Sequence, residues 1–326
     1  MKKIHDLFRK YTLIVLILAF IGVVFGTLSL IHYYNDNTMS ISFIQPIPIF
    51  AITFFALTVC AYVILAVKTP SLHVKRLKRD SGFSKFASAL AAALVAALFL
   101  FDFVRFISPG TSLMTTKIIR LPVSVPFIIY FVIELIPSKI KRKKINIPSW
   151  LPPLCSFCAV AWCIVGLLSI YFWSGVGSLP TTNFFKIAHM LYYLVAAMFF
   201  LADFSYSHLG KGHRLYILSA FTLFTITAIF TGSTTIAKFA GLLTYMNISQ
   251  FELVTAIAIG IFALSKMLAV PYTIKYVMKR EGSSGHSHSH SHSHSHSHSH
   301  SHSHHRSKQK ADSGVAKSDI PSDIDI

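Results

Sequence analysis

The sequence has few charged residues for its length. Only 13% of its 326 residues are Asp, Glu, Lys or Arg, whereas ordinary soluble domains contain about a quarter, and 53% are hydrophobic. The hydrophobic residues fall in runs of 18 or more, long enough to cross a lipid bilayer. This distribution excludes a soluble globular protein and predicts a protein that spans a membrane.

Acidic residues are scarcer still. The chain has 12 acidic against 30 basic residues, which gives a net charge of +18. The basic residues form short clusters beside apolar runs, and this pattern is typical of membrane orientation rather than of nucleic-acid binding. We therefore expect the lipid bilayer as a partner, with anionic lipid at the basic cytoplasmic loops, and no nucleic acid.

Several motifs are absent. The four cysteines all lie in apolar runs, where a disulfide framework has no reason to form. There is no phosphate-binding loop, so the chain alone is not an ATP-driven pump. The paired His and acidic residues that zinc and nickel transporters keep in mid-membrane helices are also missing from the apolar runs. No motif therefore assigns the chain to one of those families.

The long apolar runs predict eight transmembrane helices, because lipid offers no partners to unpaired backbone groups. The expected fold class is all-α: a polytopic integral membrane helix bundle, with its transmembrane domain in residues 1–280. The predicted spans are 11–34, 47–67, 83–107, 118–136, 151–173, 184–204, 215–236 and 251–274.

Basic residues alternate between the connections. They gather before the first span and after the second, fourth and sixth, while the intervening connections are nearly free of charge. Loops rich in Lys and Arg remain in the cytoplasm. The sequence therefore predicts a multi-pass protein of the cell membrane with both termini in the cytoplasm.

Two of the predicted spans resemble each other. Residues 184–204 match residues 83–103 at nine of 21 positions, and the matches include the pair Asp102 and Asp203. The topology makes these spans antiparallel, so the match predicts an inverted repeat of helices two to four and five to seven, as in many secondary transporters. The alternative is chance similarity between two helices rich in Ala, Leu and Phe.

Ionisable residues inside the apolar spans are the main candidates for function. Each costs about 2.5 to 3.5 kcal/mol at the centre of a helix, so it normally has a partner or a role. Counting along the helices predicts one group near each membrane surface. The cytoplasmic group is Glu134, Asp203 and Lys266, and the outer group is Asp102, Arg105 and His189. Four further residues also fall nearer the outer side: Arg120, Lys186, Lys238 and Glu252.

Two such groups would suit the two gates of a proton- or cation-coupled transporter. The alternative is structural. Asp102 and Arg105, three residues apart, would neutralise each other, and Lys266 would extend towards the lipid headgroups.

A stripe of hydroxyl groups marks the seventh predicted span. Thr227, Thr231 and Thr235 follow one another at intervals of four residues, which places them on one helical face. Such a stripe lines an aqueous cavity, or its hydroxyls bond to their own backbone where helices pack closely. We count Thr227 and Thr231 among the candidates for a transport path.

Residues 281–326 change abruptly in composition and are predicted to form a disordered cytoplasmic tail with a Ser-His repeat. Its imidazoles are candidate ligands for a divalent metal, Zn, Ni, Co or Cu. The alternative is slippage of a repetitive DNA tract, without a function for the repeat. The candidate ligands are His286, His288, His290, His292, His294, His296, His298, His300, His302, His304 and His305.

Three classes of function follow from these features. A secondary transporter or permease component for a small solute or cation is favoured by the charged spans and the repeat. A membrane-anchored binding or sensory platform with a metal-binding tail is the alternative. An integral-membrane enzyme is least favoured, because the connections are short and lack a dense catalytic cluster. Each class allows a homo-oligomer or a partner subunit.

The predicted topology can be tested with epitopes. An epitope inserted at Lys143 should be reached by antibody only after cells are permeabilised, because that connection is predicted to be cytoplasmic. An epitope at Asn37 should be reached in intact cells. Labelling of the Lys143 epitope in intact cells would reverse the orientation.

Overall fold

The computed structural model describes residues 82–109, 115–136, 147–172, 180–209, 212–241 and 249–284, together with 16–28 and isolated positions between 10 and 67. Every regular element within these residues is a helix, so the all-α prediction is confirmed for them. The chain divides into two units, Met1–Met278 and Lys279–Ile326. All the membrane-length helices identified lie in the first unit.

Six of the described helices are long and apolar enough to cross a membrane. This finding indicates a multi-pass membrane protein. A shorter apolar helix, Leu16–Leu28, lies within the first predicted span, whereas most of the second predicted span falls outside the described residues. The count of eight therefore stays a prediction.

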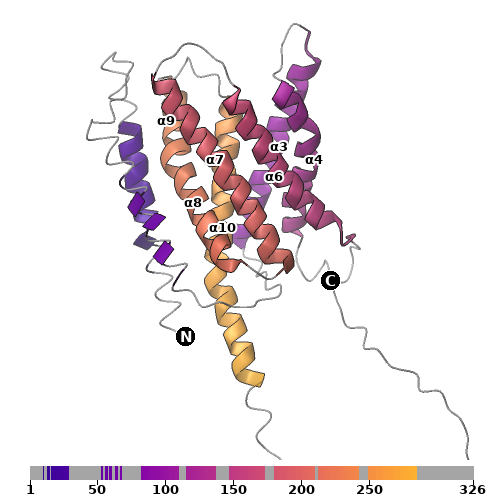
Figure 1. Cartoon of the computed structure of the whole chain (residues 1–326), viewed down its shortest axis with the longest axis vertical. Coiled ribbons are helices and arrows are strands. Elements are labelled where there is room, and N and C mark those ends of the chain that lie inside the picture. The colour runs from indigo at the N-terminus through magenta and orange to yellow at the C-terminus, as the bar shows by residue number, and fades with distance from the viewer. Residues whose placement is uncertain are drawn as a thin grey trace, which may run out of the picture. The chain divides into compact units, whose positions relative to one another are not determined.

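The helices follow the predicted spans closely at most of their ends. In Figure 1 they run alongside one another as a bundle, and α8, η2 and α9 follow a single course. The elements are α3 (Gly82–Ile107), α4 (Thr115–Leu135), α6 (Leu151–Tyr171), α7 (Pro180–Phe204), η1 (Ser205–Leu209), α8 (His213–Ile226), η2 (Thr227–Gly232), α9 (Ser233–Phe239) and α10 (Gln250–Ser284).

The seventh predicted span differs from expectation. It contains a π-helical segment, η2, between α8 and α9, where the sequence predicts an uninterrupted α-helix. The wider turn of a π-helix changes the angular spacing of side chains, so the four-residue stripe of threonines does not continue regularly through it. A second π-helical segment, η1, directly follows α7.

The packing places polar groups inside and apolar side chains outside. Asp102, Arg120, Asp203 and Lys266 are all buried. Large apolar side chains cover the outward faces instead, for example Leu100, Phe103 and Val104 on α3, and Leu194, Met198 and Leu201 on α7. An outer surface of this kind suits lipid rather than water. The span at the start of α10 has the largest buried share of the six, with 67% of its apolar stretch buried inside the bundle.

Glycine allows α10 to approach η2 closely. A Cβ atom at Gly260 would lie 2.6 Å from Cγ2 and 2.7 Å from Cβ of Thr227, so no larger residue fits there without a shift. Gly22 and Gly26 on the Leu16–Leu28 helix face Ile229 and Ser233 in the same way. Small residues at helix contacts are typical of membrane bundles.

Candidate functional site

Helix α4 carries polar side chains along most of its length, and each contacts a different neighbour. Arg120 contacts Asp102 of α3 and Glu252 of α10, and Ser124 accepts a hydrogen bond from α6. Tyr130 donates to α7, and Glu134 pairs with α10. Through these contacts α4 is bonded to four other helices of the bundle.

We call the first group the Arg120 cluster; it comprises Asp102, Lys117, Arg120 and Glu252. The two arms of the Arg120 guanidinium contact different carboxylates: Nη2 bonds to Asp102 Oδ2, and Nη1 lies 2.9 Å from Glu252 Oε1. Lys117 Nζ lies 3.6 Å from the same Glu252 oxygen. Two positive and two negative side chains therefore balance within the cluster, as burial of charge requires.

Local structure fixes the members of this cluster in place. The backbone N–H of Glu252 donates to Ser249 Oγ at 3.1 Å, and Ser249 N–H donates back to Glu252 Oε2 at 3.3 Å. This reciprocal capping box begins α10 and orients the carboxylate towards Arg120. On the other side of Arg120, the guanidinium carbon lies 5.8 Å from the centre of the Trp162 ring.

A hydrogen-bonded chain supports the same region. Trp162 Nε1 donates to Ser124 Oγ at 3.1 Å, and Ser124 Oγ donates to the Arg120 carbonyl at 2.8 Å. Buried indole and hydroxyl groups normally find such partners. The result is a continuous polar contact from α6 into the turn of α4 that carries Arg120.

The second group lies further along α4. Tyr130 donates its hydroxyl proton to Asp203 Oδ2 at 2.6 Å, and the Tyr216 hydroxyl also bonds to Asp203. One turn beyond Tyr130, Glu134 forms an ion pair with Lys266 of α10. The Lys266 ammonium lies 5.0 Å from the centre of the Phe262 ring. Both partners of this ion pair are 8% exposed.

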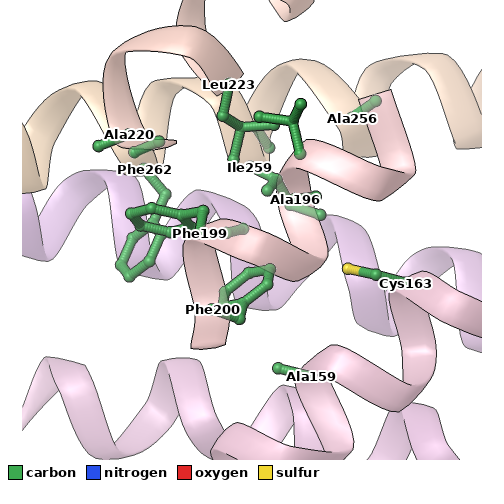
Figure 2. Close-up of a cluster of buried hydrophobic side chains, with 14 of the residues drawn as sticks. Ala159, Cys163, Ala196, Phe199, Phe200, Ala220, Leu223, Ala256, Ile259 and Phe262 are labelled. Atoms are coloured by element: carbon green, nitrogen blue, oxygen red, sulfur yellow. The ribbon is translucent and has the colours of Figure 1, made fainter. Parts of the chain in front are cut away.

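An aromatic layer separates the two groups. Phe127 and Phe131 lie between Arg120 and Glu134 on α4, and they meet Phe200 of α7 and Phe262 of α10. The ring centres of Phe127 and Phe200 are 5.2 Å apart, and those of Phe131 and Phe262 are 5.0 Å apart. Figure 2 shows Phe199 and Phe200 projecting from α7 near Phe262. The rings pack edge to face or tilted, as buried aromatic side chains prefer.

The ion pairs define the relative direction of the helices. The interval between Arg120 and Glu134 on α4 equals the interval between their partners, Glu252 and Lys266, on α10. The two helices therefore run parallel in matching register, with ion pairs about 21 Å apart. Asp102 and Asp203 both lie near the C-terminal ends of their helices, α3 and α7. Asp102 contacts the first half of α4 and Asp203 contacts the second half, so α3 and α7 run antiparallel.

The predicted cytoplasmic group is brought together in the structure. Glu134 and Lys266 form an ion pair, and Asp203 joins them through Tyr130, which lies one turn from Glu134 and bonds to the Asp203 carboxylate. The bond between Asp203 and α4 comes from a tyrosine, which carries no formal charge and so is not conspicuous in an apolar helix.

The structure adds a partner to the predicted outer group. Asp102 is buried and bonds to Arg120 of the neighbouring helix, whereas Arg105 is exposed, with its guanidinium 5.6 Å from the Phe101 ring. A buried carboxylate requires a cation from inside the bundle, and Arg105 points towards the outside. His189 is buried on α7, one turn before Tyr193. The outer cluster therefore forms around Arg120, which lies outside the predicted set.

The threonine stripe bonds to its own backbone. Thr227 Oγ1 donates to the Leu223 carbonyl at 2.7 Å, and Thr235 Oγ1 donates to the Thr231 carbonyl at 2.7 Å. Thr231 is buried, and Thr227 packs against Gly260. These contacts agree with the helix-packing alternative for the stripe. The tail histidines, 286–305, lie outside the described residues, and no cluster of three metal-binding side chains occurs within the described ones.

Sequence reasoning placed Arg120 and Glu252 nearer the outer side without including them in the site, and it missed Tyr130 and Tyr216. One signal for the first two is present. Arg120 and Glu134 carry opposite charges on the fourth predicted span, and Glu252 and Lys266 carry the reverse charges at the same spacing on the eighth. Two helices that run in the same direction pair at both positions when placed side by side.

Comparison with models of known protein families gives no match, and neither the curated proteins nor the solved structures match this chain.

The Arg120 cluster generates a prediction about stability. Arg120→Met leaves the carboxylates of Asp102 and Glu252 buried without the cation that bonds to both, so it should destabilise the protein by about 3 to 5 kcal/mol. Thermal unfolding in detergent measures the effect. Arg105→Gln should lower the unfolding temperature much less, because the Arg105 side chain is exposed and not buried beside Asp102. Equal losses for the two variants would contradict the assignment of Arg120 as the partner of Asp102.

Proposed function

We propose that the bundle is a secondary transporter or permease component that moves a small solute or cation across the cell membrane. One observation carries the proposal: ionised side chains are buried at two levels of α4, and an aromatic layer separates them. Intramembrane charges of both signs are characteristic of ion and substrate pathways. A bundle held only by apolar packing would not carry the desolvation cost of these charges, which is why they point to a functional role in addition to fixing the register of the helices.

The two levels resemble two gates. In this proposal the Arg120 cluster closes the outer side, and the Glu134–Lys266 pair with Asp203 closes the cytoplasmic side. The solute then has access from one side of the membrane at a time, because the residues of one charged group separate while those of the other group stay bonded. The aromatic layer of Phe127, Phe131, Phe200 and Phe262 excludes water between them.

Helix α4 is suited to transmit such a change. It contains Pro122 and Pro126, between the Arg120 cluster and Tyr130. Proline removes a backbone donor and weakens the helix locally, so the two halves of α4 bend more easily there than elsewhere. The ends of α4 then separate from their partners independently.

The proposed orientation keeps both termini in the cytoplasm, with Glu134 and Asp203 towards the cytoplasmic side. The basic connections support this orientation. The parallel course of α4 and α10 agrees with the predicted order of crossings, in which the fourth and eighth spans run in the same direction. In this proposal residues 1–280 form the transmembrane domain, and residues 281–326 form a cytoplasmic tail whose histidines bind Zn, Ni, Co or Cu. The inverted repeat of helices two to four and five to seven is part of the same proposal, and the antiparallel course of α3 and α7 supports it.

A membrane-anchored platform is the second candidate. The dense packing of the aromatic layer and the bonding of the threonine hydroxyls to their own backbone favour a rigid bundle. In such a protein the charges would fix the register of the helices, and the tail and basic loops would bind metal, lipid or protein.

An uptake assay distinguishes the two functions. The full chain in proteoliposomes is exposed to amino acids, monocarboxylates, K⁺ and salts of Zn, Ni, Co and Cu under an imposed pH or Na⁺ gradient. A transporter predicts gradient-dependent flux of at least one probe. Glu134→Gln should reduce that flux at least tenfold, because it removes the charge that pairs with Lys266.

The control is Met198→Leu, a change on the outward face that should leave the flux unchanged. A chain that ends at Arg280 tests the tail, and unchanged metal flux would exclude the tail from the transport step. Absence of flux for every probe, with correctly folded protein in the vesicles, would contradict transport and favour the platform.

A further inference from the structure

Asp203 differs from the other buried acidic side chains in the described spans. Asp102 and Glu252 contact Arg120, and Glu134 contacts Lys266. Within the described residues, Asp203 has no salt bridge, and its bonding partners are the hydroxyl groups of Tyr130 and Tyr216. It is only 3% exposed. Within the residues that the structure describes, no salt bridge to a basic side chain therefore balances the negative charge of Asp203.

The Asp203 site is built where two helices connect. Asp203 is the second-last residue of α7, the π-helical segment η1 begins at Ser205, and α8 returns to supply Tyr216. Tyr130 reaches the same carboxylate from α4, at 2.6 Å. π-Helical turns are rare and occur frequently at functional sites, because they displace side chains from regular α-helical positions.

Other titratable groups surround the carboxylate. Tyr206 of η1 stacks on Tyr216, with ring centres 4.9 Å apart, and Glu134 of α4 interacts electrostatically with both Tyr130 and Tyr216. Lys266 of α10 reaches the region through its pair with Glu134. His208 and His213 lie on η1 and α8, on either side of the connection.

Hydroxyl groups stabilise a carboxylate by hydrogen bonding but do not neutralise it. An unbalanced charge inside a bundle surrounded by hydrocarbon is costly, so it requires a proton or a metal ion. A metal ion requires several oxygen or nitrogen ligands around it. The described residues contain no group of three His, Cys, Asp or Glu side chains that would supply them. A proton requires only the carboxylate oxygen.

We propose that Asp203 is the site at which the bundle binds its coupling proton, in contact with Tyr130 and Tyr216. The proposal rests on the proposed transport function, and it names the coupling ion. The step is simple in chemical terms: a proton from water on the cytoplasmic side forms an O–H bond with a carboxylate oxygen of Asp203. The O–H bond of the hydronium ion that delivers the proton breaks in the same step, and a water molecule is released; otherwise only hydrogen bonds change.

Proton binding would change the contact between α4 and α7. The ionised carboxylate accepts a charge-assisted hydrogen bond from Tyr130, and such bonds are roughly twice as strong as those between neutral groups. Protonation makes the bond neutral and weakens it. Occupancy by a proton is thereby linked to separation of α4 from α7 on the cytoplasmic side of the aromatic layer.

Infrared spectroscopy tests this site without knowledge of the substrate. The full chain in liposomes is titrated with acid while the carbonyl stretching band of protonated carboxyl groups is recorded. The other acidic residues add carboxyl bands in both proteins as pH falls, so the test is the difference between them: the wild type should gain a band that is absent from Asp203→Asn. The histidines on η1 and α8 titrate without a carboxyl band, so they do not interfere.

Tyrosine variants link the band to the structure. Tyr130→Phe removes a hydrogen bond to Asp203 and should raise the stretching frequency of its carbonyl group. Tyr206→Phe is the matched control, because it removes a neighbouring hydroxyl whose ring stacks on Tyr216. It should leave the frequency nearly unchanged.

The possible results distinguish three claims: that the coupling ion is a proton, that it binds at Asp203, and that the protein is a transporter. Carboxyl bands that are the same in Asp203→Asn and the wild type over the whole titration overturn the proposal. Binding of ²²Na⁺ that is lost in Asp203→Asn also overturns it and assigns sodium to the site. If the band depends on Asp203 but no probe moves in proteoliposomes, the proton site stands and transport fails. If a pH gradient drives flux equally in the wild type and Asp203→Asn, transport stands and this site fails.

Discussion

Hydrocarbon cannot solvate a charge, and this constraint explains the arrangement of α4 and α10. Each charged side chain that faces the interior must find its partner there, because an unpaired buried charge costs several kcal/mol. Arg120 meets Glu252 and Glu134 meets Lys266, with the same spacing between the two charged positions on both helices. A shift of one helix by a single turn would break both pairs at once. The ion pairs thus select one register from the several that apolar packing alone would allow.

The rest of the bundle is arranged around that pair of helices. Helix α3 attaches to α4 through Asp102, α6 through Trp162 and Ser124, and α7 through Asp203 and Tyr130. Helix α10 also contacts α3, since Thr255 Oγ1 lies 3.2 Å from the Leu94 carbonyl. Between the polar levels, aromatic rings fill the space, and beyond them apolar side chains face outwards. The same arrangement that fixes the fold also provides two charged levels, and for this reason we assign function and stability to the same residues.

The sequence predicted the helices and the charged residues inside them better than it predicted which side chains those residues contact. The spans follow from length and hydropathy, and Asp102, Glu134, Asp203 and Lys266 were identified because a charge inside an apolar run is conspicuous. The bond from Asp102 to Arg120 of the neighbouring helix was not predicted, since proximity in sequence favours Arg105 and does not show which face of α3 is buried. Tyr130 and Tyr216 were missed because a phenol in an apolar helix resembles any other core aromatic residue. The π-helical segment in the seventh span packs against Gly260 of α10, and no local pattern within the span marks it.

An exchange of charges between α4 and α10 tests the central claim most directly. Glu134→Lys and Lys266→Glu each place two like charges together in the bundle interior, whereas the double variant restores one charge of each sign. The account predicts that each single variant lowers the unfolding temperature in detergent strongly, and that the double variant recovers most of the loss, with a coupling energy of about 0.5 to 3 kcal/mol. A double variant that loses the sum of the two single effects would show that the two side chains do not meet, and would contradict the register of the bundle.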